Sequence, residues 1–281
     1  MWSLSMPVVR IGLAPGGVTL VHMSRWGRQR IDRIEHLPCK DAATDGPVQS
    51  GAEPSSQGPW RAACEALEQW LDQQQGQRHR MAIVLSDRFV RWQILPWRIE
   101  LSGAAELTAY AALRFRETYG RVAQDWSILK ANIAPGQPAP AAAVDTGLLE
   151  TLMKSCTAAG SQLHSVAPYY ACAFDHWRSS TPTQDCWFGS VGEQALTIGR
   201  LQQGHWAALQ TQRLTSDWPA LLQTLKTQIS LACALPDEAI PLYLCGDLEP
   251  PLPLRNLPFT WLIPKRIPQG AIAGVRLALG C

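Results

Sequence analysis

Hydrophobic runs in the first part of the chain alternate with turn residues in a pattern that predicts three strands, a helix and a fourth strand. Strands are expected at Val8–Leu13, Val18–Met23 and Arg30–Leu37. The segment Pro38–Pro59, rich in Gly, Pro, Ser and Asp, reads as a flexible loop. A helix follows, because apolar residues recur at the spacing of one helical face: Trp60, Ala63, Cys64, Leu67 and Leu71. The apolar run Met81–Leu85 then suits a buried parallel strand.

The same order of elements recurs in the last hundred residues or so of the chain. Strands are predicted at Cys186–Val191, Ala195–Leu201 and His205–Thr211. Ser216 or Asp217 is expected to cap the next helix, which carries Pro219 in its first turn. A closing strand is expected at Ile240–Cys245. The pattern is therefore a tandem repeat of one arrangement.

The segment between the repeats predicts further elements of its own. Strands are expected at Val90–Leu95, Trp126–Ile133 and Gln162–Val166, with helices over Ala104–Tyr119 and after a capping Asp145. The Pro- and Ala-rich stretch Pro135–Ala143 reads as a loop.

Composition and charge narrow the function classes. The chain has 281 residues, 46% hydrophobic and 17% charged, which is typical of a folded globular protein. A formal net charge of +2 gives no electrostatic basis for a dedicated nucleic-acid binder. The 8 cysteines form no CxxC pair and the histidines no HExxH spacing, so reduced thiols and no metal site are expected. Neither a spanning helix nor a signal peptide is recognisable, which favours a cytoplasmic location.

A three-strand meander, a helix and a parallel strand, occurring twice, is the plan of the actin-like ATPase fold, an α/β fold with two tandem ribonuclease-H-like halves. The chain also resembles the PilM-like and MshI-like pilus biogenesis proteins, related to the cytoplasmic part of GspL. Four segments carry that resemblance: Val9–Ala14, Leu85–Trp97, Ala171–Ala173 and Ala271–Gly280. It implies a first half over 1–180 with a small inserted subdomain at about 90–165, and a second half over 181–281.

The resemblance also places the catalytic carboxylates of the fold, and both are absent. Magnesium prefers oxygen ligands, so ATP hydrolysis needs an acid near each phosphate loop. The two acid positions fall on Ala14 and Ser190. We therefore expect a pseudo-ATPase with no catalytic residue, no metal and no cofactor; the sequence leaves open whether ATP with Mg²⁺ still binds without hydrolysis. Candidate vestigial nucleotide-binding residues remain, although glycines here equally suit hairpin turns: Gly12, Gly16, Gly17, Gly192, Gly246 and Asp247.

Two alternatives stay open. Acids elsewhere, such as Asp87, Glu193 and Asp247, would restore an active ATPase or kinase if they converged on the cleft. A soluble scaffold of the GspL type is the other alternative.

Tryptophan and arginine dominate the energetics of protein interfaces, and the chain has 12 tryptophans. The candidate partner-binding residues are Arg88, Phe89, Arg91, Trp92, Trp97, Arg114 and Phe115. The resemblance implies a scaffold that binds the cytoplasmic N-terminal peptide of a PilN-type inner-membrane protein. Such a protein would lie peripheral to the inner membrane and reach it only through its partner.

Overall fold

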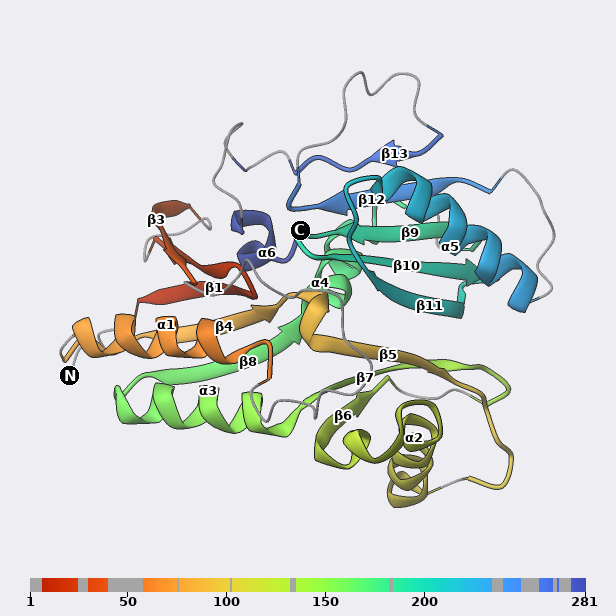
Figure 1. Ribbon diagram of the computed structural model, residues 1–281, viewed down its shortest axis with the longest axis horizontal. Helices are drawn as coiled ribbons and strands as arrows, with labels where there is room; N and C mark the ends of the chain where they lie inside the picture. Colours follow the sequence, from red (N-terminus) through yellow and green to blue (C-terminus); the bar gives the residue numbers. More distant parts are fainter. Residues whose placement is uncertain are drawn as a thin grey trace.

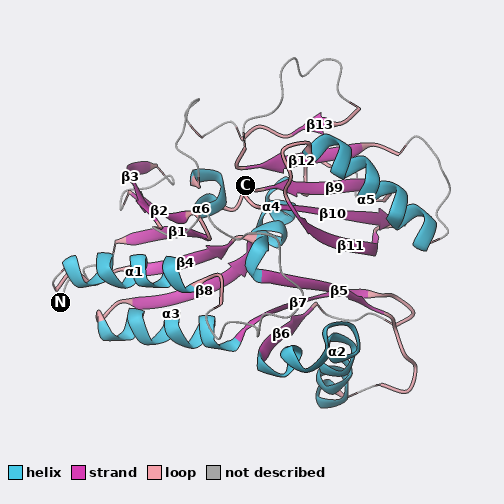
Figure 2. Ribbon diagram, in the orientation of Figure 1, coloured by secondary structure: helices cyan, strands magenta, loops and turns pink. Residues whose placement is uncertain are grey.

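The computed structural model describes residues 7–24, 30–39, 58–74, 76–101, 103–131, 135–181, 184–233, 240–248, 258–264, 267 and 274–281. Figure 1 shows two sheets on either side of a central helix, with a smaller sheet below them. Figure 2 shows the same arrangement by type of element. Most of the segment 38–59 and part of the motif 271–280 lie outside the described residues.

The first sheet has the strand order β3-β2-β1-β4-β8. Its elements are β1 (Val8–Ala14), β2 (Gly17–Met23), β3 (Ile31–Pro38), α1 (Arg61–Gln73), β4 (Arg80–Leu85), α3 (Thr146–Ala158) and β8 (Gln162–Pro168). Strand β1 is antiparallel to β2 and parallel to β4. Helices α1 and α3 contact each other, and their apolar faces share one core with strands β1, β2 and β4.

The second sheet repeats this order as β11-β10-β9-β12-β13. Its elements are β9 (Cys186–Val191), β10 (Ala195–Gln202), β11 (His205–Arg213), α5 (Trp218–Ala232), β12 (Leu242–Gly246) and β13 (Thr260–Trp261). The buried face of α5 packs on this sheet through Leu222, Leu225 and Ile229. The predicted repeat of three strands, a helix and a strand is confirmed in both halves.

Two of the expected helix caps are present. The Asp145 carboxylate accepts a hydrogen bond from the Gly147 N–H at 2.8 Å at the start of α3. Of the two candidates for α5, Asp217 caps the helix by accepting from the Ala220 N–H at 3.2 Å. These side chains satisfy backbone donors that the first helical turn leaves without a partner.

A three-stranded sheet with the order β5-β7-β6 is inserted into the first half. The inserted part of the chain comprises η1 (Asp87–Phe89), β5 (Val90–Leu95), α2 (Ala104–Tyr119), η2 (Gly120–Asp125), β6 (Trp126–Lys130) and β7 (Ala139–Asp145). The expected loop over Pro135–Ala143 is wrong, because Ala139–Asp145 is the central strand of this sheet. Its residues Ala141 and Ala143 are buried in one cluster with Phe115 of α2, where small side chains allow helix and sheet to approach.

The boundary expected at about residue 165 for the inserted part also needs correction. Helix α3 packs on α1, and β8 pairs in parallel with β4, so the chain has already returned to the first sheet after Asp145. Inserted and returning segments share the same strand and helix periodicities, so the periodicity of the sequence does not distinguish them.

Two helices join the halves. Helix α4 (Tyr169–Trp177) contacts β4 and β8 of the first sheet and β9 of the second. Helix α6 (Val275–Leu279), near the C-terminal end, returns to the first half and contacts β1, β2 and β4. The Arg10 guanidinium donates to the Leu279 carbonyl at 3.0 Å, and the Tyr169 hydroxyl to the Cys281 carbonyl at 2.7 Å. Among the described residues, no helix has both the length and the apolar character that crossing a membrane requires.

Candidate functional site

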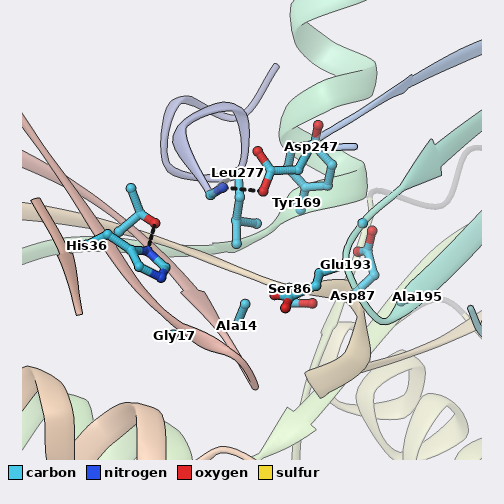
Figure 3. Close-up of a pocket in the computed structure, with 13 residues that line it drawn as sticks. Ala14, Gly17, His36, Ser86, Asp87, Tyr169, Glu193, Ala195, Asp247 and Leu277 are labelled. Carbon is cyan, nitrogen blue, oxygen red and sulfur yellow. Dashed lines mark hydrogen bonds between the residues drawn. The ribbon is translucent and has the colours of Figure 1, made fainter. Parts of the chain in front are cut away.

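A small cavity lies between the two sheets, where the hairpin turns of the two halves face each other (Figure 3). Its open volume is about 30 Å³, which accommodates on the order of two water molecules and is far too small for a nucleotide. The cavity is lined by Ala14, Gly17, Thr19, His36, Ser86, Asp87, Tyr169, Gly192, Glu193, Ala195, Asp247, Gly274 and Leu277.

The turns narrow the cavity because Glu193 of the second half lies against the first half. An added Cβ on Gly16 would stand 2.7 Å from both Glu193 carboxylate oxygens. The Glu193 charge also contributes, after burial, to raising the pKa of the Cys39 thiol on the first half. A carboxylate therefore lies against the turn that the resemblance aligns with a phosphate loop, and its charge disfavours an anion there.

The two positions where the resemblance places an acid carry a methyl group and a hydroxyl. Ala14 closes the end of β1 and has no polar side-chain group. Ser190 is 1% exposed, and its hydroxyl donates to the Asp87 carboxylate at 2.9 Å. The second acid position is thus a donor to a carboxylate that comes from the other half.

Asp87 lies at the centre of the contact between the halves. Besides Ser190, its carboxylate accepts from the Tyr170 backbone N–H at 3.1 Å, at the start of α4. Burial raises the Asp87 pKa from 3.8 to about 6, although these hydrogen bonds favour the charged form. The Tyr170 hydroxyl in turn donates to the Phe188 carbonyl of β9 at 3.1 Å.

Asp247 follows β12 and binds the start of α6. Its carboxylate accepts from the Gly274 N–H (Figure 3). It also accepts from the Arg276 N–H at 3.2 Å. Burial raises its pKa, and the same backbone hydrogen bonds oppose that rise. The Arg276 side chain donates to the Gly246 carbonyl at 2.8 Å, which fixes the turn after β12.

The carboxylates that an active ATPase or kinase would need at one point thus come together only in part. Asp87, Glu193 and Asp247 do line one cavity. The described hydrogen bonds of Asp87 and Asp247, however, go to protein donors that join the halves. Within the described ranges, no set of three or more His, Cys, Asp or Glu side chains is arranged to hold a metal ion.

The candidate glycines divide into two groups. Gly17 and Gly192 line the cavity, and Gly16 faces Glu193 across it. Gly12 instead leaves room for α6, because an added Cβ would lie 2.8 Å from the Ala278 nitrogen. Gly246 has φ of 157° and is packed on the Val191 carbonyl, so close approach between strands explains it.

Several cavity residues could not be expected from the sequence. Thr19 and His36 join β2 and β3 through a hydrogen bond of 3.0 Å between Thr19 Oγ1 and His36 Nδ1 (Figure 3). Gly274 and Leu277 arrive with α6 from the far end of the chain. No local spacing in the sequence relates Gly274 and Leu277 to the other cavity residues, because only the return of α6 to the first half brings them to the cavity.

A second feature is a groove of about 500 Å³ along β5 and β11, here called the β5–β11 groove. It is lined by Asp87, Arg88, Val90, Arg91, Trp92, Tyr119, Leu209, Gln210, Thr211, Gln212 and Arg213. Three candidate partner residues, Arg88, Arg91 and Trp92, meet here. The Arg91 guanidinium donates to the carbonyls of Arg88 and Val90, both at 3.2 Å. Its pKa is lowered by burial and by the nearby charge of Arg88.

The other candidate partner residues lie elsewhere. Phe89 and Phe115 are core residues, 6% and 0% exposed, so their side chains are not on the surface. Arg114 pairs with Glu117 on α2 at 2.7 Å. Trp97 follows β5 and is 36% exposed, but it does not line the groove.

Comparison with known proteins establishes the fold. No family model and no curated protein matches the chain. Among solved structures, the PilM-PilN type IV pilus biogenesis complex matches with a TM-score of 0.58 and 12% identity, over 97% of this chain and 96% of that one. The cytoplasmic domain of EpsL, an inner-membrane component of the Vibrio cholerae type II secretion system, matches with 0.56 and 10% identity, over 97% and 92%.

A Bacteroides thetaiotaomicron protein with an actin-like ATPase fold and unknown function matches with a TM-score of 0.56 and 12% identity, over 88% of this chain and 86% of that one. The chain thus has the actin-like ATPase fold, as its repeated elements predicted. At these identities the likeness extends to the fold alone.

Proposed function

We propose that the protein is a non-catalytic adaptor of a type IV pilus or related secretion apparatus, which binds the cytoplasmic N-terminal segment of a PilN-type inner-membrane protein. In this role it stays on the cytoplasmic side and is recruited to the membrane by that partner. The ATP-binding chemistry of the fold is not used.

The observation that supports this function best is the use of the cleft carboxylates. A metal-dependent ATPase keeps its acids available for Mg²⁺ and water. Here Asp87 and Asp247 accept hydrogen bonds from groups that join the two halves, and Glu193 lies against Gly16. The cleft thereby holds the halves together, which suits a rigid binding platform.

The full-length similarity supports the same class of role. One of the similar structures is a type IV pilus biogenesis complex, and another is the cytoplasmic domain of an inner-membrane secretion component; each is covered almost completely. A role for this chain in such an assembly rests on the cleft chemistry together with this shared architecture.

The test is capture of the partner. The chain is immobilised and mixed with a full-length PilN-type protein in lipid nanodiscs, or with the same protein lacking its cytoplasmic N-terminal segment. The proposal predicts retention of the full-length partner without added nucleotide and loss of retention on truncation. Retention that requires ATP, or that survives truncation, contradicts it.

A further inference from the structure

The β5–β11 groove lies where two sheet edges from different sheets meet. Strand β5 is an edge of the three-stranded sheet and β11 an edge of the second five-stranded sheet. The two strands contact each other without forming a ladder. Figure 1 shows them running side by side, with α2 beneath β5. An open edge next to a groove is a site where an extended peptide can bind.

Strand β11 forms a ladder on one side only among the described strands, so some of its backbone N–H and C=O groups face the groove. The Leu214 N–H donates to the Gln194 carbonyl at 3.1 Å, and antiparallel ladders alternate between bonded and non-bonded pairs. Gln210 and Gln212, two and four residues earlier, therefore pair with β10. The backbone groups of Thr211 and Arg213 point away from β10, toward the open edge.

The charge of the groove is positive. Arg88, Arg91 and Arg213 line it. Asp87 is its one carboxylate among the described lining residues, and that side chain is 4% exposed and hydrogen-bonded to Ser190 and Tyr170. Because the whole chain carries a formal charge of only +2, three arginines in one groove are a local concentration of charge. Such a groove favours an anionic ligand.

A buried acceptor favours a ligand that carries hydrogen-bond donors. The Gln210 side-chain oxygen is buried and has no hydrogen-bond partner among the described residues. A buried acceptor without a partner is costly, so a ligand that donates an N–H gains affinity there. A peptide main chain carries such donors, whereas a phosphodiester chain carries none.

We infer that the β5–β11 groove binds an extended peptide segment whose carboxylate side chains face Arg88, Arg91 and Arg213. Its main chain lies in the groove between β5 and β11 and donates to Gln210. This inference rests on the proposed adaptor function, and it names the chemistry of the segment bound.

Two fluorescein-labelled probes test it by fluorescence anisotropy: a peptide of alternating Glu and Val, and its counterpart of alternating Gln and Val. The acidic peptide is expected to bind more tightly by about tenfold or more, a difference that shrinks at high salt. Arg213→Gln, an exposed change, is expected to reduce that preference several-fold. Arg116→Gln, on the exposed face of α2, is the matched control and is expected to behave like the wild type.

A charge swap makes the test independent of folding losses. Arg213→Glu is expected to weaken the Glu–Val peptide and to gain affinity for a Lys–Val peptide. Equal binding of the Glu–Val and Gln–Val peptides, or no effect of Arg213→Gln and Arg213→Glu, overturns the inference.

The nanodisc capture separates this result from the adaptor function. If the PilN-type partner is not captured but the acidic peptide binds through Arg213, the adaptor function fails and the groove chemistry stands. If the partner is captured equally by Arg213→Glu and the peptides do not discriminate, the groove inference fails and the adaptor function stands.

Discussion

Single residues at the cleft hold the two halves of the molecule together. Ser190 stands at an acid position and donates to Asp87, which comes from the opposite half. A carboxylate at position 190 would lie against the carboxylate of Asp87 in a buried site, where two like charges are strongly unfavourable. The absence of acids at Ala14 and Ser190 is visible in the sequence. The hydrogen bonds of Asp87 to Tyr170 and Ser190 are not visible there, because these partners are 83 and 103 residues away along the chain.

Asp87 predicts a pH dependence of stability. The folded state raises its pKa from 3.8 to about 6, so the folded protein binds a proton that the unfolded chain has lost across this range. Its contribution is therefore fully present below pH 3.8 and is lost as the pH rises through about 6. By linkage the total is about 3 kcal/mol. Asp87→Asn removes this titration.

The check is urea unfolding of the wild type and Asp87→Asn from pH 4 to pH 7. The wild type is expected to lose about 3 kcal/mol relative to the variant as the pH rises. Asp32→Asn, at an exposed position of β3, serves as control with an expected pH-independent difference. A difference for Asp87→Asn that stays constant with pH would contradict the assignment.

At the scale of elements, periodicity was sufficient for the repeated strands and helices but not for the connections. The sequence predicted the three strands, helix and strand of each half. It missed β7, because that strand is mostly Ala and Pro and has one β-branched residue and no aromatic residue to mark it as a strand. It also missed α4 as a separate helix, and α6, whose five residues are too few for a helical stripe. These missed helices are the elements that assemble the cleft.

Helix α6 makes a testable contribution through Gly274. Gly274 has φ of 91°, and an added Cβ would overlap the Thr19 side chain on β2. Gly274→Ala is expected to destabilise the protein by about 2–4 kcal/mol, because a strained backbone and a steric clash add. Thermal unfolding measures the loss.

Gly136→Ala is the matched control. Gly136 also has a positive φ, of 75°, but nothing lies within 4 Å of its added Cβ. It is expected to cost about 1 kcal/mol, from backbone strain alone. Equal losses in the two variants would show that the contact of α6 with β2 is not tightly packed.

At the scale of the whole molecule, the thiols report how completely the halves are closed. All eight cysteines are free, six are buried, Cys172 is half-buried and Cys233 is exposed. Burial raises the pKa of Cys64 and Cys281 to about 12, and thiolates are the reactive form. We expect one thiol, Cys233, to react rapidly with a disulfide reagent at neutral pH. Cys233→Ser should abolish the rapid phase, and two or more rapid thiols would indicate that the halves open.

The most direct test of the central claim is a calorimetric titration of the protein with ATP, with and without Mg²⁺. The cavity between the halves has room for about two water molecules. Asp87 and Asp247 hydrogen-bond to groups that join the halves, and Glu193 lies against Gly16 in the turn between β1 and β2. We predict no heat of binding and no thermal stabilisation at millimolar nucleotide. Mg²⁺-dependent binding accompanied by phosphate release would contradict it, and would show that Asp87, Glu193 and Asp247 leave their protein partners to form an active site.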